Sequence, residues 1–257
     1  MAEEKQPRMT MPQDGSGHRF TVSPNLDIIA LQAAFRRTGR VEIVDFIAPA
    51  DAQALRAHLQ ARADWRLVLN AGVAVYEFPR AGVAQFTEAQ RRELDSRIAV
   101  AARDGFQYRY ETIRVPDASE NRGTTMLDSF VAFMGSPPVL AVVRAILGED
   151  RVAFADGQAT AYSPGDFLTR HDDDVSGKHR HAAYVLGLSP GWRAEWGGLL
   201  MFHRDDGNID EGFVPALGAL RLFAVPALHS VSYVTPSASE PRLAVTGWFR
   251  EHPGLSD

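Results

Sequence analysis

The sequence predicts an α+β fold, with helices in the N-terminal half and a β-barrel or sandwich in the C-terminal half. Between residues 24 and 150, apolar residues recur mainly at helical spacing. From residue 151, helical spacing gives way to about eight short stretches of alternating apolar and polar residues, a pattern typical of all-β barrels and sandwiches. No Pro- or Ser-rich linker separates the two halves. We therefore expect a single domain over residues 24–257, with 24–150 as mainly helical support and 151–250 as the β core.

Four helices are expected in the supporting half, at residues 26–37, 51–62, 87–103 and 136–148. The third starts with a capping box, because the side chains of Thr87 and Gln90 can each accept a hydrogen bond from the other's free backbone N–H. The first stops near Gly39 and the fourth at Gly148, since glycine readily adopts the conformation that ends a helix. Strands are expected at 41–46 and 105–111.

The β core is expected to consist of the stretches 152–162, 166–171, 182–188, 198–203, 211–215, 219–225, 229–234 and 242–250. Successive side chains of a strand point to opposite faces. In the last stretch, one face carries Arg242, Ala244, Thr246 and Trp248, and the other carries Leu243, Val245 and Phe249.

Composition excludes several classes of protein. The net charge of -5 argues against a broad nucleic-acid-binding surface. The chain has no cysteine, so any metal must be held by His, Asp or Glu. No apolar run approaches the roughly 18 residues that span a membrane. Residues 1–23 are polar and predict a disordered leader without the features of a signal peptide, which favours a cytoplasmic protein.

A candidate metal site is formed by His171, Asp173 and His229. Side chains at positions i and i+2 of an extended segment share a face, so His171 and Asp173 can reach one ion together. His229 begins a later alternating stretch. Two imidazoles and one carboxylate are the ligand set of non-haem Fe(II) oxygenases. Taken singly, the residues have simpler interpretations: a solvated His–Asp pair and a half-buried strand histidine.

Polar residues on two other stretches extend this candidate site. Arg242 starts an otherwise apolar strand, where burial is costly unless an anion such as a carboxylate pairs with it. The alternative is an arginine that reaches solvent from the strand end. Gln158, Thr160 and Tyr162 share one face of another stretch and predict a strand that lines a wet cavity. The alternative for Tyr162 is a core tyrosine with a satisfied hydroxyl.

The sequence resembles the 2-oxoglutarate- and Fe(II)-dependent dioxygenases of the prolyl-hydroxylase type. Within that group it is most similar to ribosomal-protein prolyl hydroxylases and their bacterial relatives. The resemblance covers about residues 150 to 250 and rests on His171-Asp-Asp-Asp, Ala183-Tyr-Val-Leu, the segment from Pro190 to Leu200, and the stretches from His229 and Arg242. It implies a double-stranded β-helix, or jelly roll, packed against the N-terminal helices.

The resemblance also implies roles for individual residues. His171, Asp173 and His229 would ligate iron, Arg242 would pair with the distal carboxylate of 2-oxoglutarate, and Tyr162 would approach that cosubstrate. Relatives often carry a tyrosine at the position of Gly187, whose hydroxyl helps to hold the same carboxylate. Its absence here leaves room for Thr160, Thr246 or a water.

The expected reaction is hydroxylation of an unactivated C–H group with Fe(II), 2-oxoglutarate and O2, and ascorbate is considered as an additional reductant. The expected substrate is a prolyl residue in a protein, including a ribosomal or translation protein, or proline itself. Two alternatives stay open: a small metabolite or natural product as substrate, and a non-catalytic jelly-roll binding module. A basic cluster, Lys178–His181, is interpreted as a solvated loop rather than a site for an acidic substrate group. No nucleic-acid or membrane partner is expected, and the sequence leaves the oligomeric state open.

Overall fold

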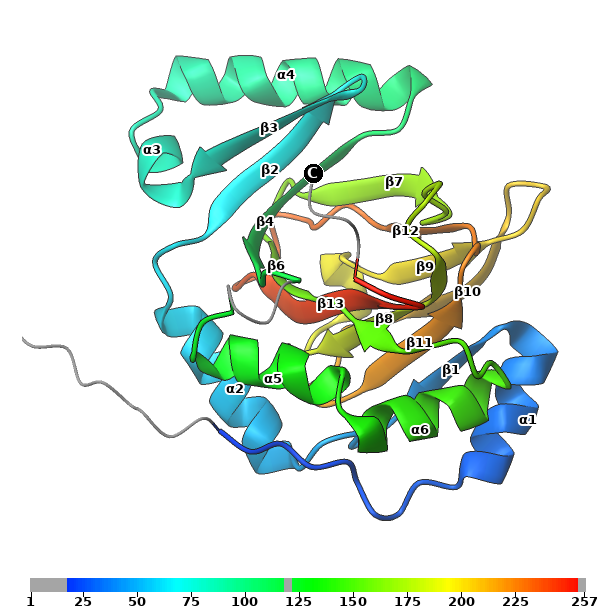
Figure 1. Cartoon of the computed structure of the whole chain (residues 1–257). Helices are drawn as coiled ribbons and strands as arrows, with labels where there is room; N and C mark the ends of the chain where they lie inside the picture. Colours follow the sequence, from blue (N-terminus) through cyan, green and yellow to red (C-terminus); the bar gives the residue numbers. More distant parts are fainter. Residues whose placement is uncertain (1–17, 118–121, 254–257) are drawn as a thin grey trace, which may run out of the picture.

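The computed structural model describes residues 18–117 and 122–253. Within these residues, one thirteen-stranded antiparallel sheet curls into a half-barrel, and helices cover it on two sides (Figure 1). This is the double-stranded β-helix with supporting helices that the sequence predicted.

The strands follow one path through the curled sheet, in the order β1-β11-β8-β13-β6-β4-β7-β12-β9-β10. Strand β2 pairs with β3 and β4, and β5 pairs with β13. Strand β4 pairs with β6 along one part and with β7 along another, so it joins the two walls of the barrel. The bounds are β1 Arg40–Ile43, β2 Arg66–Ala71, β3 Ala74–Pro79, β4 Tyr108–Arg114, β5 Phe154–Ala155, β6 Gln158–Tyr162, β7 Phe167–His171, β8 Arg180–Gly187, β9 Leu200–His203, β10 Ile209–Phe213, β11 Leu220–Ala224, β12 His229–Val231 and β13 Arg242–Arg250.

Helices form two separate groups (Figure 1). Four of them pack below the barrel: α1 Ile28–Thr38, α2 Pro49–Ala61, α5 Met126–Met134 and α6 Pro137–Leu147. Helices α3 Arg80–Ala84 and α4 Glu88–Asp104 lie with the β2–β3 hairpin above the barrel. There, Ile98 and Leu94 of α4 pack on Leu67 and Leu69 of the hairpin, which form a small core of their own.

The two faces of the barrel strands have different surroundings. The outer face packs on the lower helices and forms the main core, with Tyr184, Leu186, Val245 and Phe249 all fully buried. The inner face carries a smaller apolar cluster that includes Val185, and polar side chains lie beside this cluster. Because burial of apolar surface is the main favourable term in folding, the outer face supplies most of the stability. The inner face contributes less to the core and lines a cavity.

Most expected elements are confirmed, and the four predicted helices differ from the observed ones by at most two residues at each end. The capping box of α4 is present, and Gly39 and Gly148 end α1 and α6 in the left-handed conformation. The β2–β3 hairpin and helix α5 were not predicted, so residues 24–150 are less purely helical than expected.

The predicted disordered leader, residues 1–23, includes residues that the structure places against the core. Residues 1–17 lie outside the described part of the chain. Phe20, however, is 5% exposed and its ring lies 5.2 Å from that of Phe130. One apolar side chain anchored in the core, with the Ser23 backbone N–H donating to the Phe46 carbonyl, is enough to order residues 18–23.

No single helix in the described part of the chain is long and apolar enough to cross a membrane. Helices α5 and α6 satisfy the length and composition test only as a pair bent by 48°. Their apolar residues are buried in the main core.

Candidate active site

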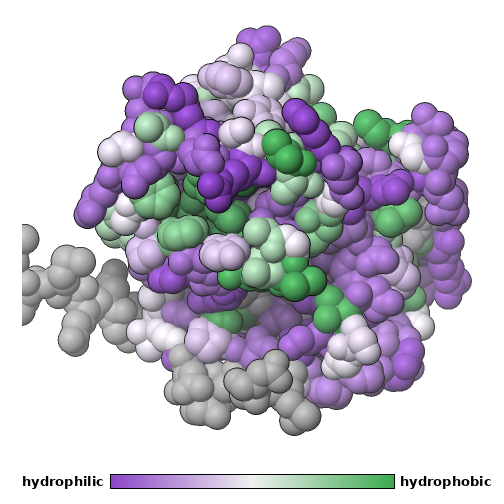
Figure 2. Space-filling model, turned by 90° about the horizontal axis from the view of Figure 1, so that it is seen from above, coloured by the Kyte–Doolittle hydropathy of each residue, from purple (hydrophilic) through white to green (hydrophobic). Residues whose placement is uncertain are grey.

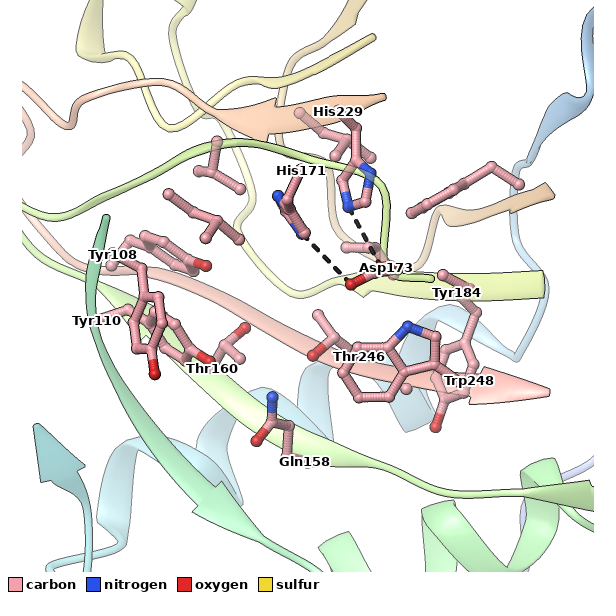
Figure 3. Close-up of a pocket in the computed structure, with 18 of the residues that line it drawn as sticks. Tyr108, Tyr110, Gln158, Thr160, His171, Asp173, Tyr184, His229, Thr246 and Trp248 are labelled. Atoms are coloured by element: carbon pink, nitrogen blue, oxygen red, sulfur yellow. Dashed lines mark ion pairs between the residues drawn. The ribbon is translucent and has the colours of Figure 1, made fainter. Parts of the chain in front are cut away.

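Three side chains converge inside the barrel at the ends of strands β7 and β12. His171 and His229 are directly opposite each other in the antiparallel β7–β12 pair, and their ring centroids are 4.1 Å apart. The Asp173 carboxylate lies between them, with Oδ1 3.3 Å from Nε2 of His171 and Oδ2 3.4 Å from Nε2 of His229. Figure 3 shows both imidazoles directed at this carboxylate.

Backbone carbonyls fix the orientation of both imidazoles. Nδ1 of His171 is 3.0 Å from the Thr169 carbonyl oxygen, and Nδ1 of His229 is 2.7 Å from that of Ala227. A carbonyl oxygen can only accept a hydrogen bond, so each Nδ1 must carry the proton. Nε2 is therefore the ring nitrogen that each histidine directs at Asp173, the orientation that a metal-binding histidine needs.

The route by which Asp173 reaches the site differs from the prediction. Strand β7 ends at His171, and Asp173 follows in a loop with φ of 63°, so the two residues do not share one extended segment. Aspartate tolerates this left-handed conformation better than most residues. The loop is held by the Arg180 guanidinium, which donates to the Asp173 carbonyl at 3.0 Å. The pairing of His171 with Asp173 was right, but strand alternation was the wrong reason for it.

The charge of Asp173 suits a residue that binds a metal cation. Burial alone would raise the pKa of its carboxyl group, but the two imidazoles beside it hold the pKa well below its usual range. Asp173 is therefore an anion at neutral pH. All three donor atoms lie within 4.8 Å of one another, and they form the only group of three or more His, Asp and Glu side chains placed to share an ion within the described residues. Two imidazole nitrogens and one carboxylate oxygen, open on one side to a cavity, fit Fe(II).

The cavity beside the triad has a volume of about 520 Å³. Arg242 lies in its wall, buried to 4% exposure, with its guanidinium carbon 5.1 Å from the centre of the Tyr162 ring. Among the described residues no carboxylate lies within ion-pair distance of Arg242, and its Nε has no hydrogen-bond partner. Burial lowers the pKa of this guanidinium to about 10, which still leaves it charged at neutral pH. A buried cation without an anion marks a site for an anionic ligand.

Polar side chains of β6 and β13 continue the wall. Thr160 and Tyr162 line the cavity, as predicted, and Thr246 lines it too. The Thr160 hydroxyl is buried without a partner. Tyr162 is 3% exposed and stacks on Tyr110 with 5.1 Å between ring centroids, and burial raises the pKa of its phenol well above the usual value. Tyr162 is therefore a neutral residue of the wall and not a base.

Gly187 has no room for a side chain. A Cβ at this position would lie 2.1 Å from the Ala216 carbonyl oxygen and 3.2 Å from Nη1 of Arg221. The segment before β11 thus occupies the space beside Gly187. Any second hydroxyl for an anion at Arg242 must come from another wall, and the buried Thr160 hydroxyl has no hydrogen-bond partner.

The basic cluster at residues 178–181 is not a uniform solvated loop, which corrects the sequence interpretation. Arg180 starts β8, lines the cavity, and stacks 3.7 Å above the Trp248 ring. Its Nε and the Trp248 indole N–H have no partner. His181 points elsewhere and contacts Glu251 at 3.0 Å. Because Arg180 and His181 are consecutive residues of a strand paired with β13, their side chains point to opposite faces. The run of basic residues in the sequence does not by itself indicate this strand.

The residues of β4 also extend the site. Tyr108 and Tyr110 line the cavity and belong to a row of rings that starts at Phe106. The pairing of β4 with β6 and β7 turns these aromatic side chains into the barrel rather than toward the helices. Arg109, on the opposite face, pairs with Asp166 and Asp95.

Comparison with known proteins agrees with this geometry. Residues 157–250 match the model of the 2OG-Fe(II) oxygenase superfamily. No curated protein matches the chain in sequence.

Solved structures share the fold. The chain is similar to a Pseudomonas putida prolyl-4-hydroxylase, with 20% identity, a TM-score of 0.56, and coverage of 87% of this chain and 98% of the other. A Trichoplax adhaerens prolyl hydroxylase in complex with a hypoxia inducible factor peptide fragment has 12% identity and a TM-score of 0.53, covering 87% and 89%. The α-ketoglutarate-dependent epimerase SnoN from nogalamycin biosynthesis has 13% identity and a TM-score of 0.53, covering 86% and 81%.

The family match includes both histidines, the aspartate and Arg242, and it covers most of the strands that line the cavity but not β3 or β4. The curled sheet is the fold of that family. Residues 157–250 thus form the part of the chain that matches the 2OG-Fe(II) oxygenase superfamily, and their His–Asp–His triad and curled sheet fit an enzyme that uses Fe(II), 2-oxoglutarate and O2.

Proposed function

We propose that this oxygenase hydroxylates a prolyl residue within a protein or peptide, or proline itself as the smallest such substrate. Iron held by His171, Asp173 and His229 supplies the oxidising power for C–H hydroxylation when 2-oxoglutarate and O2 are bound. The observation that carries the cosubstrate assignment is the unpaired, buried Arg242 in the same cavity as the triad.

The cosubstrate has two ends that suit two parts of the wall. Its distal carboxylate suits the Arg242 guanidinium, which can donate two parallel hydrogen bonds. Thr160 is proposed as the second donor, because its buried hydroxyl has no other partner. Thr246 lies on the same face of β13 as Arg242, and Tyr162 forms the ring against which the guanidinium rests. The 2-oxo acid end suits the metal.

The rest of the cavity is suited to an apolar, ring-sized group. Its remaining wall is largely apolar or aromatic and includes Phe106, Tyr108, Tyr110, Leu168, Val185 and Trp248. Apart from Asp173, the lining contains no carboxylate, so a cationic substrate is disfavoured. A pyrrolidine ring is compact, apolar and neutral within a polypeptide. The unpartnered donors of Arg180 and Trp248 can receive peptide carbonyls beside it.

The mouth of the cavity favours a macromolecular substrate over a small one. Val75, Phe106 and Val175 line the cavity yet are 55%, 49% and 46% exposed. Seen from above, hydrophobic residues are exposed in patches among hydrophilic ones (Figure 2). Exposed apolar side chains gathered at a mouth are typical of an interaction surface. The structural likeness to a prolyl hydroxylase with a bound peptide points in the same direction.

Within this proposal, a ribosomal or translation protein met in the cytoplasm is the substrate that the sequence resemblance favours. A second candidate, a small natural product, is favoured by the likeness to SnoN, which acts in nogalamycin biosynthesis. A non-catalytic module is disfavoured, because the triad and Arg242 would serve no purpose in it.

The test is incubation of the iron-loaded enzyme with proline-containing peptides, free proline and a small-metabolite mixture, with 2-oxoglutarate and with or without ascorbate. We expect succinate release and a +16 Da product on a prolyl residue, both dependent on 2-oxoglutarate, with peptides as the best substrates. The Asp173→Ala enzyme is the control for uncatalysed oxidation. Products only from the metabolite mixture would replace the prolyl proposal, and no substrate-dependent succinate from any set would favour the binding module.

A further inference from the structure

A second cleft adjoins the cavity. Its volume is about 280 Å³, and the two spaces meet at Gln158, Arg180 and Trp248, which line both. A ligand that fills the cavity and continues past Trp248 therefore enters this cleft. A single proline or other small molecule has no need of it, whereas an extended polypeptide, which advances about 3.3 Å per residue, does.

Cationic side chains outnumber carboxylates in the lining of the cleft. Arg114, Lys178, Arg180 and Arg250 are present against two carboxylates, those of Asp117 and Asp156. Both carboxylates are already paired with Arg250, at 3.0 and 2.8 Å. Arg114 is paired with Glu77. The charges that remain for a ligand are therefore those of Lys178 and Arg180.

These two residues are available in different ways. The Arg180 guanidinium is partly occupied, because Nη1 donates to the Asp173 carbonyl and lies 4.0 Å from its carboxylate. Its Nε remains buried without a partner. Lys178 is half-buried in the loop between β7 and β8, and no carboxylate of the described residues lies within ion-pair distance of its ammonium group. Its backbone carbonyl accepts a hydrogen bond from Nε of the buried Arg250, which fixes the loop at this point.

From this arrangement we infer that the cleft binds an Asp or Glu side chain of a polypeptide substrate, a few residues from the target residue, with Lys178 as the principal cation. The inference rests on the proposed peptidyl substrate and adds a sequence requirement to it. Half-buried charge pairs are stronger than exposed ones, because less water screens them. The acidic residue would thus contribute to specificity as well as to affinity.

The test uses enzyme loaded with Mn(II) and 2-oxoglutarate without O2, and fluorescently labelled peptides with a central proline. One Asp is moved through the four positions on each side of the proline, and each peptide has an Asn counterpart. Fluorescence anisotropy is expected to show roughly 5- to 20-fold tighter binding for Asp than for Asn at one or two neighbouring positions, with a smaller ratio at high salt.

Charge exchange identifies the partner. Lys178→Gln should abolish the Asp preference, and Lys178→Glu should instead favour a peptide with Lys at the same position. Arg92→Gln is the matched control, because Arg92 is an exposed cation on α4 that pairs only with Glu88. Lys178 is one of two lysines in the chain, so amine labelling followed by mass spectrometry gives a second readout in the unaltered enzyme. The Asp peptide should protect Lys178 from labelling, and the Asn peptide should protect it less.

Three outcomes have different meanings. An Asp preference that depends on Lys178 supports the inference. Peptides that bind and are hydroxylated with equal affinity for Asp and Asn at every position, or a preference that survives in Lys178→Gln, overturn it and leave the prolyl proposal intact. Absence of binding and hydroxylation for every peptide overturns both.

Discussion

Two buried arginines lie at opposite ends of strand β13, and their surroundings differ in one respect. Arg250 is 3% exposed and pairs with Asp117 and Asp156, while Arg242 is 4% exposed and has no carboxylate partner among the described residues. Burying a guanidinium is costly unless an anion or hydrogen-bond acceptors compensate. The fold supplies the anion at one end. At the other end a ligand must supply it.

The same contrast separates the two faces of the barrel. On the outer face, the buried Tyr184 hydroxyl donates to the Asp156 carbonyl at 2.8 Å. On the inner face, the Thr160 hydroxyl, the Arg180 Nε and the Trp248 indole N–H have no partner. Buried polar groups in folded proteins are normally satisfied, so a group of unsatisfied ones facing a single cavity indicates where ligands bind.

Removing the metal ligands should produce the largest functional loss. For His171→Ala or Asp173→Ala we expect at least a thousand-fold fall in turnover, about 4 kcal/mol, with loss of bound iron. The free energy of unfolding of the metal-free protein should change by about 1 kcal/mol or less, because neither residue belongs to the main core. Iron content and urea unfolding measure the two effects. His58→Ala, on helix α2, is the control, and full activity in either ligand variant would refute the assigned triad.

The two ends of β13 should respond differently to the loss of a charge. Asp156→Ala removes one of the two carboxylates that pair with the buried Arg250, and we expect a loss of about 3 kcal/mol in the free energy of unfolding. Arg242→Ala leaves no carboxylate behind, so its loss should be about 1 kcal/mol or less. Denaturant unfolding of both variants measures this difference. Equal destabilisation would mean that Arg242 is also held by the fold.

For the affinity of 2-oxoglutarate, by contrast, we expect Arg242→Ala to have a larger effect than Asp156→Ala. In Arg242→Ala we expect 2-oxoglutarate to bind the Mn(II) enzyme about 10- to 100-fold more weakly, or 1.4–2.7 kcal/mol, as measured by calorimetry. Arg242→Lys should lose less, because it keeps the charge but not the two parallel donors. Leu243→Ala provides the matched control on the outer face. It should cost about 2–4 kcal/mol of stability while cosubstrate affinity stays the same.

Much of this contrast could be predicted from sequence, because it follows from period-two alternation. The assignment of Arg242, Thr246 and Trp248 to one face of β13 and of Val245 and Phe249 to the other is confirmed. Local patterns determine such faces, and they also determined the helix caps.

The features of the site that were not predicted depend on tertiary structure. The left-handed φ of Asp173 and the Arg180 contact that supports it involve a loop whose shape no periodicity encodes. The row from Phe106 to Tyr110 faces the cavity only because β4 pairs with β6 and β7. The obstruction at Gly187 comes from Ala216, nearly thirty residues later.

A third buried ionisable group, Asp166, is intermediate between the fully paired Arg250 and the unpaired Arg242. Asp166 is 2% exposed, and its Oδ1 is 3.0 Å from Nε of Arg109, yet that Nε makes no hydrogen bond of acceptable geometry. Burial raises the pKa of Asp166 to about 7, and Arg109 offsets this only in part. In the unfolded chain the pKa of an aspartate is about 3.9. Folding therefore takes up a proton between about pH 4 and pH 7.

The sign of the pH effect follows from this proton uptake. The contribution of Asp166 to the free energy of unfolding should be greatest below about pH 4 and should fall by at most ~1.4 kcal/mol per pH unit up to about pH 7. Asp166→Asn cannot ionise and should lack this slope. Denaturant unfolding of both proteins at pH 5, 6, 7 and 8 measures it, and the wild-type protein should lose stability relative to the variant over the first two steps. Parallel profiles would mean that Arg109 compensates Asp166 as completely as Asp156 compensates Arg250, and that unsatisfied buried charge is confined to the cavity.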